Sequence, residues 1–256
     1  MRLPVCILII SFWICCNGIG QSIGNPPGTL PVNDTMFADA GEVTNAGWRE
    51  YLSYLINRKD SSAFLAALPM RGTFPDDGSI DEWHRHTYRY PSYNLNPITG
   101  ISYEQAVNFC SWRTRMANLL IYFRKHKIKK KKVYDHMDDS IPILFYYRLP
   151  TKAEWEMIAI KATETKKGGN DSINCNYAGV SFIMGTSSSF FTQPAPLPMI
   201  RFYHLLGNVA EMVAERNIAK GGSYMDDCSI CTIKNDTAYT QPDAWLGFRC
   251  VAIIFK

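Results

Sequence analysis

The chain has 256 residues, of which 46% are hydrophobic and 20% are charged. This composition is typical of a globular protein with one large domain or two small ones. The formal net charge is only +4, and much of it comes from the basic run RKHKIKKKK at 124–132. No nucleic-acid motif and no amphipathic helix accompanies this run. We therefore interpret it as a solvated loop and expect no nucleic-acid partner.

The first 20 residues have the features of an export signal. Arg2 gives a positive start, Val5–Ile14 form a short apolar run, and a small-residue exit precedes position 21. We predict a signal peptide at 1–20 and a mature protein that is periplasmic or secreted. The alternative is a lipoprotein anchored at Cys15 or Cys16. No later segment has the roughly 20 apolar residues that a membrane helix needs, so we expect no transmembrane span.

Up to residue 100, loop signals surround two predicted elements. Residues 21–35 are rich in Gly, Pro and Ser and predict a flexible or extended lead-in. A strand is expected at Met36–Asp39 and a helix from Asn45. Apolar residues at helical spacing give that helix one buried face, namely Trp48, Tyr51, Leu52, Leu55 and Ile56. Residues 71–100 show little periodicity and predict a long irregular segment.

Two capping boxes predict the starts of two further helices. Ser102 with Gln105 forms the first, and Val107 is expected to face the core on that helix. Thr151 with Glu154 forms the second. Beyond residue 165, short apolar pieces alternate with Gly, Ser, Asn and Pro, which predicts strands and loops. No internal repeat is visible, so we expect one domain over 36–256.

Six sequence blocks, in order, resemble those of the formylglycine-generating enzyme family, also called the sulfatase-modifying-factor family. They are EVTNAGWREYL from Glu42, PITGISYEQAVNFCSW from Pro97, YRLPTKAEWEMIA from Tyr147, GNVAEM from Gly207, KGGSY from Lys220 and LGFRC from Leu246. The resemblance implies an α+β, duplicated C-type-lectin-like fold, loop-rich with small twisted sheets. The local style of the blocks is most similar to exported Bacteroidetes members of the gliding-motility type.

The resemblance also implies where a copper site would lie. In the family's enzymes two cysteines hold copper(I) within GGSYM-C-x4-C; here Asp226 takes the first position and Cys231 matches the second. A carboxylate is a hard ligand that suits copper(I) poorly, so we expect no copper. Cys228 could instead pair with Cys231, which would make Cys231, Cys228 and Ser223 the catalytic candidates. Alternatively, Cys228 or Cys231 forms a disulfide, with Cys175 as one candidate partner.

GNVAEM resembles the family's calcium-associated GN-V-W-E-W block. Calcium prefers oxygen ligands, so the candidate calcium ligands are the carbonyls of Gly207 and Val209 and the carboxylate of Glu211. The family usually has Asn or Asp three residues before the Gly, whereas this chain has His204, and an imidazole is a poor calcium ligand. The alternative is that Glu211 and Asn208 satisfy backbone groups in a buried turn.

The cysteines outside the signal segment are odd in number, so at least one thiol stays unpaired within the chain. They are Cys110, Cys175, Cys228, Cys231 and Cys250. In the family, the cysteine of the helix block bonds to the cysteine of LGFRC. The resemblance therefore implies a Cys110–Cys250 disulfide, which an oxidising compartment permits.

These features predict an exported, non-catalytic family member that acts as a binding or scaffold module, with protein partners in the cell envelope. Asp226 at the first copper position favours this interpretation. The alternative is a copper-dependent formylglycine-generating oxidase, or another oxygen-using enzyme with altered ligands, built on Cys228 and Cys231.

Overall fold

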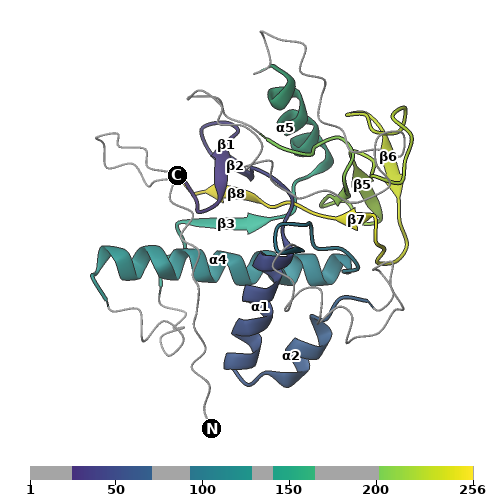
Figure 1. Cartoon of the computed structure of the whole chain (residues 1–256). Helices are drawn as coiled ribbons and strands as arrows, with labels where there is room; N and C mark the ends of the chain where they lie inside the picture. Colours follow the sequence, from purple (N-terminus) through teal and green to yellow (C-terminus); the bar gives the residue numbers. More distant parts are fainter. Residues whose placement is uncertain (1–24, 71–92, 129–140, 165–201, 256) are drawn as a thin grey trace.

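The computed structural model describes residues 25–70, 93–128, 141–164 and 202–255. Within these residues, two small four-stranded sheets and four helices are joined by long loops (Figure 1). The expected α+β, loop-rich architecture is confirmed. Residues 71–92 of the predicted irregular segment at 71–100, the lysine run at 129–132 and Cys175 lie outside the described residues.

The first sheet is antiparallel throughout and has the strand order β1-β2-β8-β3. Its strands are β1 (Thr29–Pro31), β2 (Met36–Asp39), β8 (Val251–Ile254) and β3 (Phe145–Arg148). The C-terminal strand thus lies in the middle of the sheet, next to the strand predicted at Met36–Asp39. Side chains alternate between the two faces, as the period of a strand requires. Phe37 and Phe145 pack in one core cluster, and Met36 and Val251 in the other.

The strand β1 lies inside the segment 21–35 that we expected to be a flexible or extended lead-in. Leu30 pairs with Ala38, and the Thr29 hydroxyl donates to the carbonyl of Pro26 at 2.7 Å. The ordered domain therefore begins before Met36, earlier than the predicted boundary. The Gly- and Pro-rich composition conceals this strand, since both residues are typical of loops. Proline is nevertheless tolerated in a strand at the edge of a sheet, where one backbone N–H needs no ladder partner.

The second sheet gathers the C-terminal sequence blocks. Its strand order is β6-β5-β4-β7, with β4 and β7 parallel and the other pairs antiparallel. The strands are β4 (Ala210–Met212), β5 (Ile218–Lys220), β6 (Asp236–Ala238) and β7 (Leu246–Gly247). GNVAEM enters β4, KGGSY leaves β5, and LGFRC connects β7 to β8. These three blocks, at 207–212, 220–224 and 246–250, therefore meet at one sheet.

The helices are α1 (Asn45–Asn57), α2 (Ser61–Ala66), α4 (Tyr103–Lys125) and α5 (Lys152–Glu164). Both predicted capping boxes are confirmed. The Ser102 hydroxyl accepts from the Gln105 N–H at 3.2 Å, and the Gln105 side chain accepts from the Ser102 N–H at 2.7 Å. At α5, Thr151 and Glu154 exchange the same pair of bonds at 3.2 and 2.8 Å.

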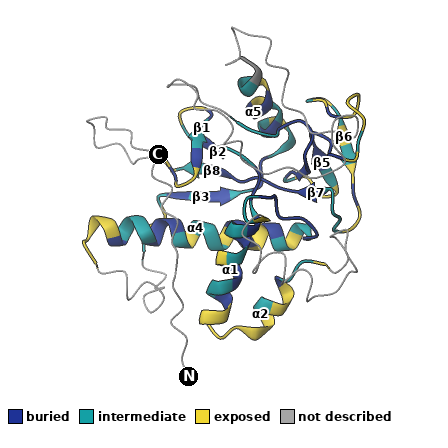
Figure 2. Cartoon of the chain, viewed as in Figure 1, coloured by how far each residue is buried: buried dark blue, intermediate teal, exposed yellow. Residues whose placement is uncertain are grey.

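Two expected core positions on the helices are wrong. Ile56 is 54% exposed and Val107 is 38% exposed. Val107 is rotated by about 100° from Ala106, which is fully buried, and so it turns away from the sheet that α4 covers. Ile56 lies near the C-terminal end of α1 and follows Leu55, the last buried residue of that helix. Figure 2 shows exposed residues at this end of α1, where the chain leads to α2.

The two helix layers lie on opposite faces of the first sheet (Figure 1). On one face, α1 and α4 enclose an aromatic cluster in which Trp48 stacks on Phe109 at 5.3 Å and meets Phe248 edge-on at 6.3 Å. On the other face, α5 buries Trp155 and Ile158 completely. No helix of the described residues is both long and apolar enough to cross a bilayer.

Candidate functional site

The loop after β5 carries the candidate copper residues, and two glycines shape its start. Gly221 and Gly222 have φ values of +91° and +68°, a region that favours glycine. A Cβ on Gly221 would lie 2.4 Å from the carbonyl oxygen of Leu205, and one on Gly222 would lie 2.8 Å from the Cys231 sulfur. The loop therefore packs tightly against the 205 segment and against Cys231.

Asp226 closes a turn on Ser223. Its Oδ2 accepts from both the backbone N–H and the hydroxyl of Ser223, each at 2.8 Å. The Asp226 N–H donates to the Ser223 carbonyl at 3.1 Å, and the Met225 N–H donates to the Ser223 hydroxyl at 3.2 Å. Ser223 is only 1% exposed. The carboxylate at the first copper position thus satisfies two donors of a buried serine.

The two cysteines of this loop occupy different environments. Cys231 is buried, packs in the core cluster around Trp155, and directs its thiol toward the Ser223 carbonyl at 3.7 Å. Cys228 is exposed and, like Cys110 and Cys250, it is not bonded to another cysteine in this structure. Among the described residues, no three His, Cys, Asp or Glu side chains are grouped to hold a metal ion.

The GNVAEM turn is built around a buried ion pair. Glu211 is fully buried, and its Oε2 accepts from the indole N–H of Trp155 at 2.7 Å and from Arg249 Nε at 2.6 Å. Its Oε1 accepts from Arg249 NH2 at 2.5 Å. The sequence pattern pointed to calcium or to backbone groups as the partners of Glu211, and it gave no sign of Arg249. Three N–H groups, two of them from the cationic guanidinium of Arg249, already donate hydrogen bonds to the Glu211 carboxylate. A calcium ion does not fit this arrangement, because it would need the same carboxylate oxygens.

Two titratable groups beside this pair have shifted pKa values. Asn208 donates to Glu42 Oε1 at 2.7 Å, and Glu42 Oε2 has no hydrogen-bond partner within the described residues. Burial, then repulsion from Glu211, raises the pKa of Glu42 well above its usual value. Burial, then the charge of Arg249, lowers the pKa of His204 to about 4. His204 is therefore neutral at neutral pH, and the shift in Glu42 favours its protonated form.

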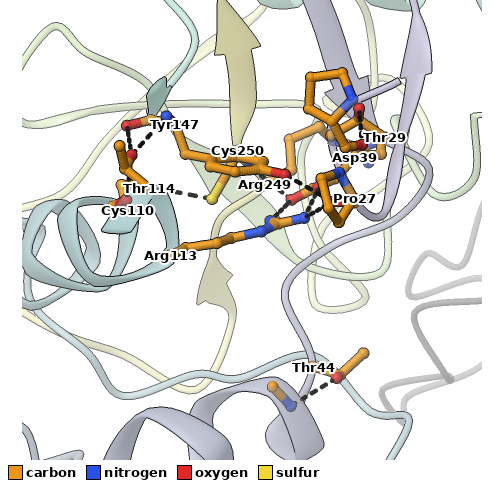
Figure 3. A network of polar contacts seen from close by, with 12 residues as sticks. Pro27, Thr29, Asp39, Thr44, Cys110, Arg113, Thr114, Tyr147, Arg249 and Cys250 are labelled. Carbon is orange, nitrogen blue, oxygen red and sulfur yellow. Dashed lines mark hydrogen bonds and ion pairs between the residues drawn. The ribbon is translucent and has the colours of Figure 1, made fainter. Parts of the chain in front are cut away.

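A second buried network joins β2, α4, β3 and the start of β8 (Figure 3). Asp39 accepts from both terminal nitrogens of Arg113 at 2.7 Å and from the Cys250 N–H at 2.9 Å. The Arg113 guanidinium lies 4.2 Å from the centre of the Tyr147 ring. The sulfurs of Cys110 and Cys250 lie 3.4 Å apart at the edge of this network. The structure thus brings together the predicted pair, and its bonding stays a prediction.

The ion pair between Asp39 and Arg113 was not predicted from the sequence. A signal for Asp39 was present, because an acidic residue ending the otherwise apolar strand MFAD needs a buried partner. Nothing in the sequence pattern says which of the arginines supplies it.

Comparisons with known proteins found a matching family model and several similar solved structures. The family model described as "Sulfatase-modifying factor enzyme 1-like domain" matches residues 20–254. Among solved structures, the chain is similar to Treponema denticola variable protein 1, with 16% identity, a TM-score of 0.48, and coverage of 86% of this chain and 84% of that one. It is also similar to PvdO from Pseudomonas aeruginosa, with 16% identity, a TM-score of 0.49, and coverage of 86% and 80%.

A third similar structure is CarF, with 17% identity, a TM-score of 0.45, and coverage of 86% of this chain and 87% of that one. A search of curated proteins finds no match. The family match spans nearly the whole chain, and the six sequence blocks meet around the two sheets. This chain belongs to the sulfatase-modifying factor enzyme 1-like family.

Proposed function

We propose that this protein is an exported, non-catalytic member of its family that acts as a binding or scaffold module in the cell envelope. The observation that carries the proposal is the role of Asp226. Its carboxylate accepts two hydrogen bonds from Ser223 where the family's enzymes place the first copper thiolate. The export part of the proposal rests on the signal-like segment at 1–20.

Recruiting Asp226 to a metal would be unfavourable for two reasons. Copper(I) is soft and prefers thiolates to carboxylates. In addition, turning the carboxylate away would leave the N–H and hydroxyl of Ser223 without their acceptor in a position that is 1% exposed. Unsatisfied buried donors typically cost about 1–3 kcal/mol each. The loop is therefore stabilised in a form that lacks one of the two thiolates.

The same loop has features of a contact surface for a protein partner. Met225 is 53% exposed and Ile230 is 38% exposed, and exposed Asp227 and Cys228 lie between them in the sequence. The Ile230 N–H donates to the Asp227 carbonyl at 2.9 Å, so the loop is internally braced. A braced loop that presents large apolar side chains loses little conformational entropy on binding, and methionine adapts to varied partners.

Copper(I) titration of the reduced protein tests the non-catalytic assignment, together with incubation with copper(I), oxygen and a CxPxR peptide. We expect no tight one-to-one binding, and mass spectrometry should show no turnover of the peptide cysteine to an aldehyde. The matched variant is Asp226→Cys, which restores the missing first thiolate and should bind copper(I) more tightly than the wild-type chain.

The enzyme alternative makes a different prediction in the same experiment. Cys231 occupies the second copper position, and Cys228 lies three residues before it. Repeated turnover by the wild-type chain that disappears in Cys231→Ser would support the oxidase and overturn the non-catalytic assignment. The Cys228→Ser variant then shows whether Cys228 supplies the first thiolate.

A further inference from the structure

The turn from His204 to Glu211 is tightly curled, and a cation of the protein itself contacts its buried carboxylate. His204, Gly207 and Asn208 have positive φ values of +52°, +75° and +62°. These angles curl the chain beside Glu211, which is fully buried. The guanidinium of Arg249, from the connection between β7 and β8, reaches the same carboxylate. It approaches with two of its nitrogens, at 2.5 and 2.6 Å.

Arg249 also joins the segments that a bound ion would otherwise cross-link. Its NH1 donates to the carbonyl of Asp39 at the end of β2, at 3.1 Å. Its NH2 donates to the carbonyl of Tyr203, immediately before the turn, at 2.8 Å. A calcium ion stabilises loops in the same way, by drawing carboxylate and carbonyl oxygens from several segments to one positive centre. Here the guanidinium holds two backbone carbonyls and one carboxylate together.

Arg249 already compensates the buried negative charge of Glu211. Glu211 and Arg249 form one ion pair, while buried Glu42 favours the protonated acid because its pKa is raised. His204 is neutral at pH 7, and the nearby Asp39 has its own partner in Arg113. Adding a doubly charged ion would leave net positive charge in the core beside a fixed guanidinium. Buried charge without compensation is strongly unfavourable.

We propose that the Arg249 guanidinium is the resident cation of the turn at 204–211 and that the fold of this turn does not depend on calcium. The family resemblance points to calcium at Gly207, Val209 and Glu211, and the contacts of Glu211 point instead to an internal ion pair. The inference is independent of whether the protein is catalytic.

Thermal unfolding of the full chain tests this proposal without a variant. We expect the same Tm in millimolar calcium chloride and in EDTA. Terbium(III) gives a second readout, because the Trp155 indole donates directly to Glu211 at 2.7 Å and would sensitise the emission of an ion bound there. We expect no saturable terbium emission that calcium displaces. A calcium-dependent rise in Tm that Glu211→Gln abolishes would overturn the proposal.

The variant Arg249→Ala, compared with Arg113→Ala, tests the role of the guanidinium itself. Both replacements remove a buried arginine that pairs with a buried carboxylate, so both should lower the Tm in EDTA. Only Arg249→Ala should gain a rise in Tm on addition of calcium, because only there do turn carbonyls and an open carboxylate come together. An Arg249→Ala variant as stable as the wild-type chain in EDTA would contradict the proposal.

Discussion

The sulfur atoms of Cys110 and Cys250 lie 3.4 Å apart in the core, although 140 positions separate the two residues along the chain. Cys110 lies on α4 and is 2% exposed, and Cys250 immediately precedes β8 and is fully buried. The contact therefore connects the helix layer to the strand that lies at the centre of the first sheet.

We predict that this pair oxidises to a disulfide in an oxidising compartment. Closing a loop of this length contributes roughly 5 kcal/mol in the chain-entropy model, as an upper guide. A non-reducing peptide map should show the Cys110–Cys250 peptide, and reduction after unfolding should lower the refolded protein's free energy of unfolding. Cys228 is the internal control, since its exposed thiol should react with maleimide in the native state. Alkylation of Cys110 after unfolding without reductant would contradict the prediction.

The Asp39–Arg113 pair should contribute more to stability than the exposed pairs. Asp39 is 5% exposed and accepts a bidentate contact at 2.7 Å, so Asp39→Asn leaves the guanidinium without its counter-charge. Breaking a buried pair on one side typically costs about 3–5 kcal/mol. Urea unfolding should show this loss. The matched control is Glu104→Gln at the exposed pair with Arg216, where the change should be small. Equal losses in the two variants would argue against the buried network as a stabilising unit.

The local signals in the sequence predicted the elements well, because each depends on neighbouring residues. Both capping boxes, the strand at Met36–Asp39 and the helix after Asn45 formed as expected. Short strands were harder to predict. Thr29–Pro31 became a strand only because β2 offers it an antiparallel partner, and such pairing is invisible in a window of a few residues.

For the candidate site, the sequence pattern singled out residues but not their contacts. It drew attention to Asp226 and Glu211 because of their positions within two of the blocks, and it did not identify the groups that they bind. Asp226 reaches back to the N–H of Ser223 three residues earlier, as the acidic residue of a capping box does. Glu211 bonds to Trp155 and Arg249, which are 56 and 38 residues distant. Such pairing depends on the tertiary fold, so no spacing rule reveals it.

The pH dependence of stability should show that the half-buried His204 is neutral in the folded protein. Its pKa is about 4 in the folded protein, below the ordinary value of 6.5, so the unfolded chain binds the proton first. Stability should therefore fall as pH decreases from about 6.5 to 4 and then level off, by about 3 kcal/mol from this group. Replacing His204 with Gln should remove that part of the slope in denaturant titrations. An unchanged slope in the variant would mean that His204 is not buried in its neutral form.

Glu42 should act in the opposite direction. Its raised pKa makes the folded state bind a proton that the unfolded state releases above about 4.5, so its contribution declines as pH rises. Glu42→Gln keeps an acceptor for Asn208 and removes this titration. Relative to the wild-type chain, the variant should gain stability as the pH rises above about 4.5. A difference that stays constant over this range would contradict the prediction.

The effect of replacing Gly221, the first of the two glycines that open the candidate loop, can be compared with the effect of replacing a glycine in a helix. Gly221→Ala places a Cβ 2.4 Å from the Leu205 carbonyl oxygen at a φ of +91°, and a backbone atom cannot move aside as a flexible side chain can. We expect a loss of at least about 2 kcal/mol in the free energy of unfolding, combining strain at positive φ with the clash.

The control is Gly47→Ala in α1, where the nearest atom outside its helix backbone and chain neighbours would be 3.7 Å from the new Cβ. There the replacement should stabilise by about 0.4–1 kcal/mol, because alanine restricts the unfolded chain. Chemical denaturation measures both free energies, and the opposite signs make the comparison decisive. If Gly221→Ala were neutral, the 205 segment would have to be free to shift, and the close packing of the loop that holds Ser223 and Asp226 would be wrong.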